Sequence, residues 1–90
     1  MNLVFKVFYS QEAQKQLKKL DKQSSSRIFM WIEQRLINCQ NPRLWGAALV
    51  GEFSGFWKYR IGDFRLICEI KDNELIIQVI SLGDRKEIYK

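Results

Sequence analysis

The chain begins with a stretch in which apolar and polar side chains alternate. Over residues 3–9 one side of the alternation is wholly apolar or aromatic, and the other side carries a single charge, Lys6. A period of two is typical of a β-strand, and apolar side chains on both sides indicate that both faces are at least partly covered. We therefore predict a strand here that is buried on part of both faces.

Two helices are expected next. Ser10 is a typical N-cap, and apolar residues then recur at helical spacing as far as about Asp21. The serines at 24–26 suggest a second cap, followed by helical spacing through about Asn38. The apolar positions are Ala13, Leu17 and Leu20 in the first helix, and Ile28, Trp31, Ile32, Leu36 and Cys39 in the second. Because Asn41-Pro42 ends the second helix and only two or three residues join the two, an antiparallel helical hairpin is predicted.

Three strands complete the pattern after an irregular, glycine-containing connection. They are expected at about residues 56–61, 64–71 and 74–82. Gly62-Asp63 suits a two-residue hairpin turn of type I′ or II′, and Asp72-Asn73 is a weaker turn signal. The order β-α-α-β-β-β predicts a single α+β domain over residues 1–90. Its sheet should be antiparallel-rich, with the N-terminal helical hairpin packed on one face.

The stretch "WKYRIGDFRL" places like charges opposite each other. With a two-residue turn at Gly62-Asp63, Arg60 stands opposite Arg65 and Lys58 opposite Ile67. One face of the hairpin is then apolar, with Trp57, Tyr59, Ile61, Phe64, Leu66, Cys68 and Ile70. Three cations converge on the other face, although opposed like charges destabilise a sheet. Either this is an ordinary solvated face on which salt screens the repulsion, or an anion bridges the cations through charge-assisted hydrogen bonds.

The C-terminal stretch "SLGDRKEIYK" adds two candidate residues. Arg85 and Tyr89 are four apart, so they fall on one side of the chain in a helical turn or an extended tail. The strand that ends before them is expected to neighbour the strand of Arg65, so Arg85 could return toward Arg65.

The formal charge of +5 lies entirely in the first half of the chain. Residues 1–50 hold eight Lys and Arg against three Asp and Glu, whereas residues 51–90 hold seven of each. A positive excess favours a polyanionic partner. The lysines around the first helix are either a solvated face or a surface for RNA or phosphate. They are Lys15, Lys18, Lys19 and Lys22.

The absence of histidine excludes several kinds of site. Ser-His-Asp and Cys-His nucleophile systems need an imidazole base, and most zinc sites need histidine or paired cysteines. Cys39 and Cys68 are far apart in sequence, so we expect two reduced thiols, mostly buried, with no metal and no cofactor. No apolar run is long enough to span a bilayer and no signal peptide is recognisable, so we expect a cytoplasmic protein that does not insert into membranes.

Taken together, these stretches resemble the RelE/ParE toxin superfamily of type II toxin–antitoxin systems. The most specific segments are Y-R-x-G-D-x-R-L at residues 59–66 and G-x-R-x-x-x-Y at residues 83–89. The resemblance covers nearly the whole chain. It implies a RelE-like fold and, in the RelE branch, a translation-inhibiting mRNA interferase that cleaves mRNA in the ribosomal A site. The residues that match the RelE catalytic set are Lys58, Arg60, Arg65, Arg85 and Tyr89.

The resemblance also implies a mechanism and partners. RNA supplies its own nucleophile, the 2′-hydroxyl, so a metal-independent endoribonuclease needs only to move protons and to stabilise phosphate charge. Arg60 and Arg65 would hold the phosphate, Lys58 or Tyr89 would take the proton, and Arg85 would act at the leaving oxygen. A RelB-like cognate antitoxin, the ribosome and mRNA are the implied partners, with a toxin–antitoxin hetero-oligomer possible. The alternative is a ParE-like toxin that binds and inhibits DNA gyrase without RNase activity.

Overall fold

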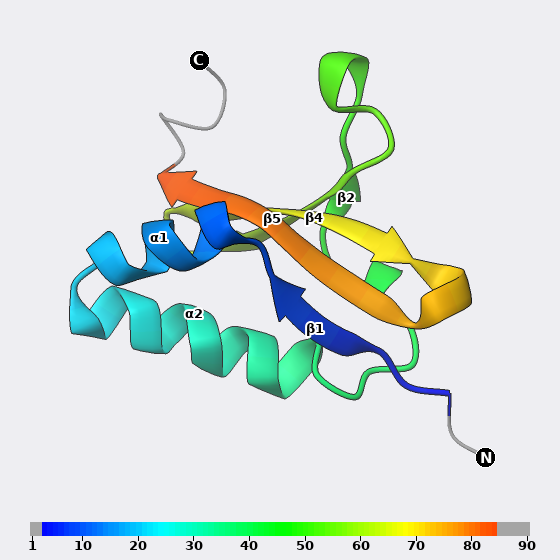
Figure 1. Cartoon of the computed structure of the whole chain (residues 1–90), viewed down its shortest axis with the longest axis horizontal. Helices are drawn as coiled ribbons and strands as arrows, with labels where there is room; N and C mark the ends of the chain where they lie inside the picture. Colours follow the sequence, from blue (N-terminus) through cyan, green and yellow to red (C-terminus); the bar gives the residue numbers. More distant parts are fainter. Residues whose placement is uncertain (1–2, 85–90) are drawn as a thin grey trace.

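The computed structural model describes residues 3–84, and it describes Phe53 and Asp84 by their backbone alone. A five-stranded sheet with the order β1-β5-β4-β3-β2 carries the helical hairpin on one face (Figure 1). The elements are β1 (Lys6–Tyr9), α1 (Gln11–Lys19), α2 (Lys22–Arg35), η1 (Pro42–Leu44), β2 (Ala47–Ala48), η2 (Gly51–Phe53), β3 (Trp57–Ile61), β4 (Phe64–Lys71), η3 (Asp72–Glu74) and β5 (Ile76–Asp84). β1 runs parallel to β5, and the other neighbours are antiparallel. The predicted α+β class is confirmed.

The two helices are capped by side chains at their N-termini. Ser10 Oγ accepts a hydrogen bond from the backbone N–H of Ala13 at 3.0 Å, as predicted. The predicted cap of the second helix at residues 24–26 is wrong. Asp21 caps α2 instead, because its Oδ2 accepts from the N–H of Ser24 at 3.1 Å. This bond lowers the pKa of the Asp21 carboxyl. The serines therefore lie inside the first turns, and Leu20 and Asp21 form the whole connection between the helices.

The β3–β4 hairpin has the register expected from its sequence. Ile61 pairs with Phe64, Arg60 with Arg65, and Lys58 with Ile67. Gly62 has φ +58°, whereas Asp63 does not enter the positive-φ region, which corresponds to a type II′ turn. Between β4 and β5 the register shifts at Ile67/Cys68, so that Ile67 faces Ser81 and Cys68 faces Val79. This bulge bends the sheet beside the cationic residues.

The main core lies between the helical hairpin and the sheet. It joins the apolar stripes of both helices to the inner faces of β3, β4 and β5. Its members are Phe5, Ala13, Leu17, Ile28, Ile32, Leu36, Tyr59, Ile61, Leu66, Cys68, Ile77, Val79 and Leu82. Tyr59 is fully buried, and its hydroxyl donates to the carbonyl oxygen of Pro42 at 2.6 Å, which ties β3 to η1. Burial raises the pKa of the Tyr59 hydroxyl and of the Cys68 thiol.

The remaining differences from the prediction lie at element ends. α2 ends at Arg35 rather than near Asn38, whose φ of +63° places it in the left-handed region where helical turns commonly stop. β1 begins at Lys6 rather than Leu3, because the N–H of Phe5 donates to Cys39 O outside the sheet. The last strand starts and ends two residues later than expected, since Asp72–Glu74 form a 3-10 turn before it.

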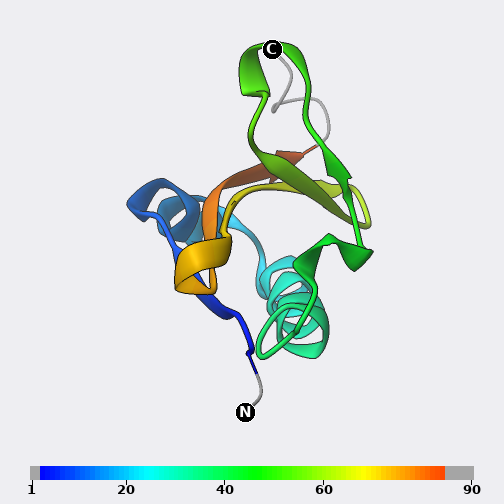
Figure 2. The ribbon, with the colours of Figure 1, turned by 90° about the vertical axis from the view of Figure 1, so that its right-hand side faces the viewer.

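A two-residue strand, β2, lies within the connection that was predicted to be irregular. It pairs with β3, with Ala47 opposite Lys58. Alanine has little preference for strands, so the sequence carries no signal for this pairing. Beyond β2 the chain rises from the sheet on the side away from α2 and returns into β3 (Figure 2). The connection between β2 and β3 therefore borders one side of the face that carries the cations.

Candidate functional site

Arg60 and Arg65 face each other across the β3–β4 hairpin, but their environments differ. The pairing itself is as predicted. Arg60 is exposed, whereas Arg65 is only 7% exposed and is the one charged residue buried in the described chain. Directly opposed residues have Cβ atoms about 4.5–5.5 Å apart. A buried and an exposed arginine side chain therefore start from adjacent positions on the same face of the sheet.

The buried guanidinium of Arg65 is not satisfied by the described part of the chain. Its Nε and Nη1 atoms are both buried and have no hydrogen-bond partner there. Guanidinium groups keep their positive charge in proteins, so these nitrogens remain donors at all ordinary pH values. Burying a charged donor without an acceptor is costly. An anion that accepts from these nitrogens would remove that cost.

The face around Arg65 is less open than the sequence predicted. Ile67 is 5% exposed and Leu49 8% exposed, yet neither belongs to the main core. Strand alternation and the register put Ile67 on the same face as Lys58, and Leu49 lies at the base of the rising connection, where its N–H donates to Phe56 O at 3.0 Å. The alternative of an ordinary solvated face does not hold at Arg65 and Ile67, because this face has buried apolar residues of its own.

Lys58 completes the described cationic group. It occupies the same face of β3 as Arg60, is partly buried, and lies between Ala47 of β2 and Ile67 of β4. The structure thus brings Lys58, Arg60 and Arg65 onto one face, as the alternation predicted. Arg85 and Tyr89 lie outside the described residues. β5 leads toward them, and Gly83 of β5 pairs directly with Arg65.

Within the described chain, neither Arg60 nor Arg65 forms an ion pair with a carboxylate. The contrast is Arg43, whose Nη1 and Nη2 donate to Asp72 Oδ1 and Oδ2 at 2.9 Å each. These hydrogen bonds lower the pKa of the Asp72 carboxyl and raise that of Arg43. The charge of Arg43 is therefore balanced locally, whereas no carboxylate among residues 3–84 balances the two arginines of the hairpin.

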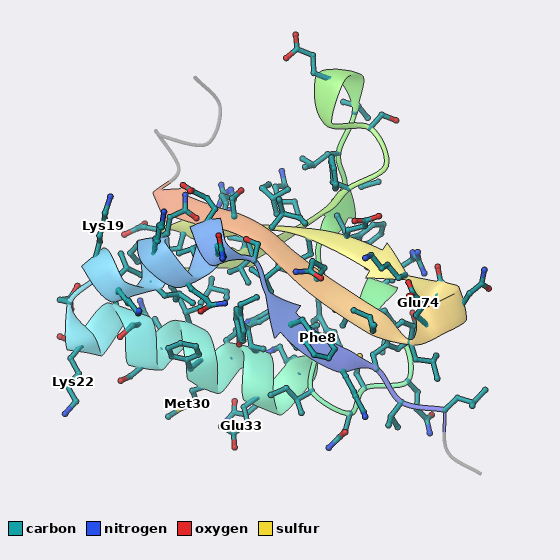
Figure 3. All side chains as sticks on the ribbon, viewed as in Figure 1. Phe8, Lys19, Lys22, Met30, Glu33 and Glu74 are labelled. Atoms are coloured by element: carbon teal, nitrogen blue, oxygen red, sulfur yellow. The ribbon has the colours of Figure 1, made fainter. Side chains whose placement is uncertain are left out.

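The four lysines predicted as an RNA surface do not share one surface. All four are exposed, but Lys22 begins α2 rather than extending α1. Lys19 and Lys22 lie at the same end of the molecule, but their side chains point in opposite directions (Figure 3). Lys19 lines a hollow with Phe64 and Gly83 at the end of the hairpin. Lys18 and Lys22 instead line a groove between the two helices. Lys15 lies on α1 and is exposed.

Three further findings concern the described residues. Residues 3–84 contain no group of three or more Cys, Asp or Glu side chains placed to hold a metal ion. Both cysteines are free thiols, with Cys68 buried as predicted and Cys39 partly buried. None of the described helices has the length and apolar character that crossing a membrane requires.

Comparison with known proteins identifies the family. A family model described as the ParE toxin of the type II toxin–antitoxin system parDE matches residues 7–89. The chain belongs to this family, within the RelE/ParE superfamily. It is therefore a toxin of a type II toxin–antitoxin system.

Several proteins to which this chain is similar are named for RelE. An Escherichia coli protein named for its likeness to RelE toxins is 30% identical over 88 residues, covering 94% of this chain and 90% of the relative. Among solved structures, the toxin–antitoxin complex RelBE2 from Mycobacterium tuberculosis contains a chain with TM-score 0.78 and 19% identity, covering 93% of this chain and 94% of that one. The isolated E. coli RelE toxin has TM-score 0.72 and 22% identity, with 96% and 92% coverage. These structures share the fold.

Sequence reasoning missed two features of this toxin. The buried apolar residues on the face of the cations include Leu49, which lies in the stretch expected to be irregular. The groove between the helices includes Phe29, which did not fit the apolar stripe of the second helix. A large aromatic residue outside the predicted stripe was the available signal for the groove.

Proposed function

We propose that this toxin is an endoribonuclease that cleaves mRNA in the ribosomal A site, and that it acts in the cytoplasm, where ribosomes translate. The observation that carries the proposal is Arg65, a buried guanidinium with two nitrogens that find no acceptor among residues 3–84, opposite a second arginine. A phosphodiester supplies the missing acceptor and offsets the repulsion between the two side chains. The relatives named for RelE support the same assignment.

In this mechanism the RNA brings the nucleophile and the protein brings charge and position. Arg65 holds the scissile phosphate from a fixed position, and the exposed Arg60 closes on the same phosphate. Both stabilise the extra negative charge of the transition state. Lys58 lies on the same face and, with Tyr89, is a candidate to take the 2′-hydroxyl proton. Arg85 is assigned to the leaving oxygen. Its role and that of Tyr89 rest on the sequence resemblance.

Dependence on the ribosome follows from the kinds of side chain at this site. Arginine and ordinary lysine exchange protons poorly near neutral pH, so the site has weak intrinsic acid–base power. Fixing the mRNA in a reactive geometry can supply several kcal/mol of the barrier, on the order of 7–11 kcal/mol in the best intramolecular cases. The ribosome provides this positioning. Lys19, on the side of the hairpin end, is the best placed of the helix lysines to contact ribosomal RNA.

Regulation is proposed to come from a cognate RelB-like antitoxin. Solved structures with this fold include toxin–antitoxin complexes named RelBE. The cationic face calls for an acidic or amphipathic cover when the toxin is inactive. The toxin and its antitoxin would form a hetero-oligomer.

The second candidate function is inhibition of DNA gyrase, because the matching family model is named for ParE. The two functions separate in one experiment. Purified toxin is incubated with programmed ribosomes, and mRNA ends are mapped by primer extension, while a parallel reaction measures gyrase supercoiling. RNA cleavage confined to the A-site codon, with gyrase unaffected, supports the proposal. Gyrase inhibition without cleavage would replace it with the ParE-like function.

Site variants sharpen this experiment. Arg60→Gln and Arg65→Gln each remove one cation from the face, and we expect cleavage to fall by about 10²–10³-fold, the usual effect of removing one charge-stabilising group. Lys6→Gln removes an exposed cation of β1 and is the matched control, with cleavage unchanged. Equal activity in all three variants would show that the cationic face has no part in the reaction.

A further inference from the structure

A groove lies between α1, α2 and the end of β1, on the helical side of the sheet. Its volume is about 430 Å³. Its apolar lining is formed by Leu17 of α1, Leu20 of the connection between the helices, Tyr9 of β1 and Phe29 of α2. It therefore lies in the opposite layer from Lys58, Arg60 and Arg65, which occupy the other face of the sheet.

The aromatic residues of this groove are only partly covered. Phe29 is 43% exposed, although its ring packs edge-on against Tyr9 with the ring centroids 5.9 Å apart. Burial of the Tyr9 ring raises the pKa of its hydroxyl. The two rings thus form an apolar surface that packs against the protein on one side and contacts solvent on the other. A partner that covers Phe29 would remove this ring from water.

The rim of the groove is positively charged. Lys18 contributes from the last turn of α1 and Lys22 from the first turn of α2. The other polar lining residues are Gln14 and Ser25, and the lining contains no carboxylate. An apolar lining between two ammonium groups is complementary to a segment that carries apolar side chains flanked by Asp or Glu.

RNA fits this groove less well than a protein segment does. The two lysines could contact phosphates, but RNA recognition by aromatic residues uses ring faces on which bases stack. Here the rings meet edge to face, and two leucines make up much of the apolar lining. A ribose-phosphate chain would leave those aliphatic groups without an apolar partner, whereas an amphipathic peptide covers them.

We propose that this groove docks an acidic amphipathic segment of the cognate antitoxin. This proposal rests on the proposed function only in assuming that an antitoxin exists. It does not depend on whether the toxin cleaves RNA. Because the groove and the cationic face lie in different layers, the docked segment does not cover the site. It anchors the antitoxin, and other parts of the antitoxin must reach the cationic face.

The test measures binding between the full-length toxin and the product of the reading frame adjacent to its gene, by biolayer interferometry. Phe29→Ala is expected to weaken binding by about 30-fold or more, the level of an interface hot spot. Lys18→Glu with Lys22→Glu should weaken it by about 10-fold or more, and this loss should shrink at high salt. Thermal melts of each variant confirm folding, which is expected because these side chains are at least partly exposed.

Matched controls come from neighbouring positions. Met30→Ala removes a neighbouring apolar side chain that is even more exposed and lies outside the groove, and Lys15→Glu reverses a charge on α1 outside it. Both should bind like the parent chain. Unchanged antitoxin binding by the groove variants would overturn the proposal. An equal loss of binding in the groove variants and the control variants would overturn it too. It would also be overturned if the lysine variants lost ribosome binding in sedimentation and kept antitoxin binding, since RNA would then be the occupant. Binding is measured without catalysis, so a toxin with no RNase activity would leave this result intact.

Discussion

Replacing Arg65 by methionine should stabilise the toxin and inactivate it at the same time. Arg65 is 7% exposed, and the Nε and Nη1 atoms of its guanidinium have no partner in the described chain. Each unsatisfied buried donor costs about 1–3 kcal/mol, so the two together cost about 2–6 kcal/mol. Methionine fills most of the same space without polar atoms, and it also removes the repulsion from Arg60.

Part of this gain is lost because methionine is smaller and leaves some space unfilled. Replacing buried ion pairs by apolar residues of similar volume is often stabilising by about 1–4 kcal/mol, and we expect a net effect in this range for the unpaired charge of Arg65. In a domain of this size each kcal/mol shifts Tm by roughly 4–8 °C, so the rise should be easily detected by circular dichroism. RNA cleavage by the same variant should fall by about 10²–10³-fold.

Arg60→Met is the matched control because it removes the opposite arginine from an exposed position. Its Tm should change little, although its cleavage also falls. Inorganic phosphate should raise the Tm of the parent chain and of Arg60→Met more than that of Arg65→Met, since a ligand stabilises only the folded state that binds it. A drop in Tm for Arg65→Met would refute this reasoning, because it would mean that the guanidinium is satisfied where it lies.

Three further predictions concern the scaffold. Tyr59→Phe leaves the Pro42 carbonyl without its donor, so the free energy of unfolding at pH 7 should fall by about 1–3 kcal/mol. Burial raises the Tyr59 pKa, so the parent chain loses stability as pH rises above the ordinary value near 10. Denaturant melts should therefore show the difference in unfolding free energy between the parent chain and Tyr59→Phe narrowing above that pH. Gly46→Ala should destabilise the fold strongly in the same melts, because φ is +79° and a Cβ would overlap a β3 carbonyl oxygen; an unchanged midpoint would contradict the close approach. With a thiol reagent at pH 8, Cys39 should react faster than Cys68, since burial raises the Cys68 pKa further; equal rates would contradict this.

The sequence predicted those features that depend on local geometry. A two-residue turn and a period of two set the pairing of Arg60 with Arg65 and put Lys58 on the same face, and the structure has both. The cap of α2 was misassigned because Asp21 and the following serines are all good capping residues, and only the three-dimensional path of the chain selects one.

Features that depend on distant segments could not be predicted in the same way. The burial of Arg65 and Ile67 requires knowing what lies over their face, including a connection whose short strand β2 has no strand signal. The groove depends on how α1 and α2 pack, which leaves Phe29 at its edge rather than in the core. Alternation assigns a residue to a face, but it does not say how far that face is covered.

The inequality of the two arginines explains how the sheet tolerates them. If both guanidinium groups were fixed, their repulsion would act at full strength in a partly buried setting. Here Arg65 is held in place and Arg60 is exposed, so Arg60 can turn into water and let solvent and salt screen the pair. In the proposed site, Arg65 is already positioned for a phosphate, and only one side chain has to be ordered when the phosphate binds. A fixed donor stabilises a developing charge without reorganising, and a mobile one closes on it. The pairing that weakens the free sheet is therefore the arrangement a phosphate site requires.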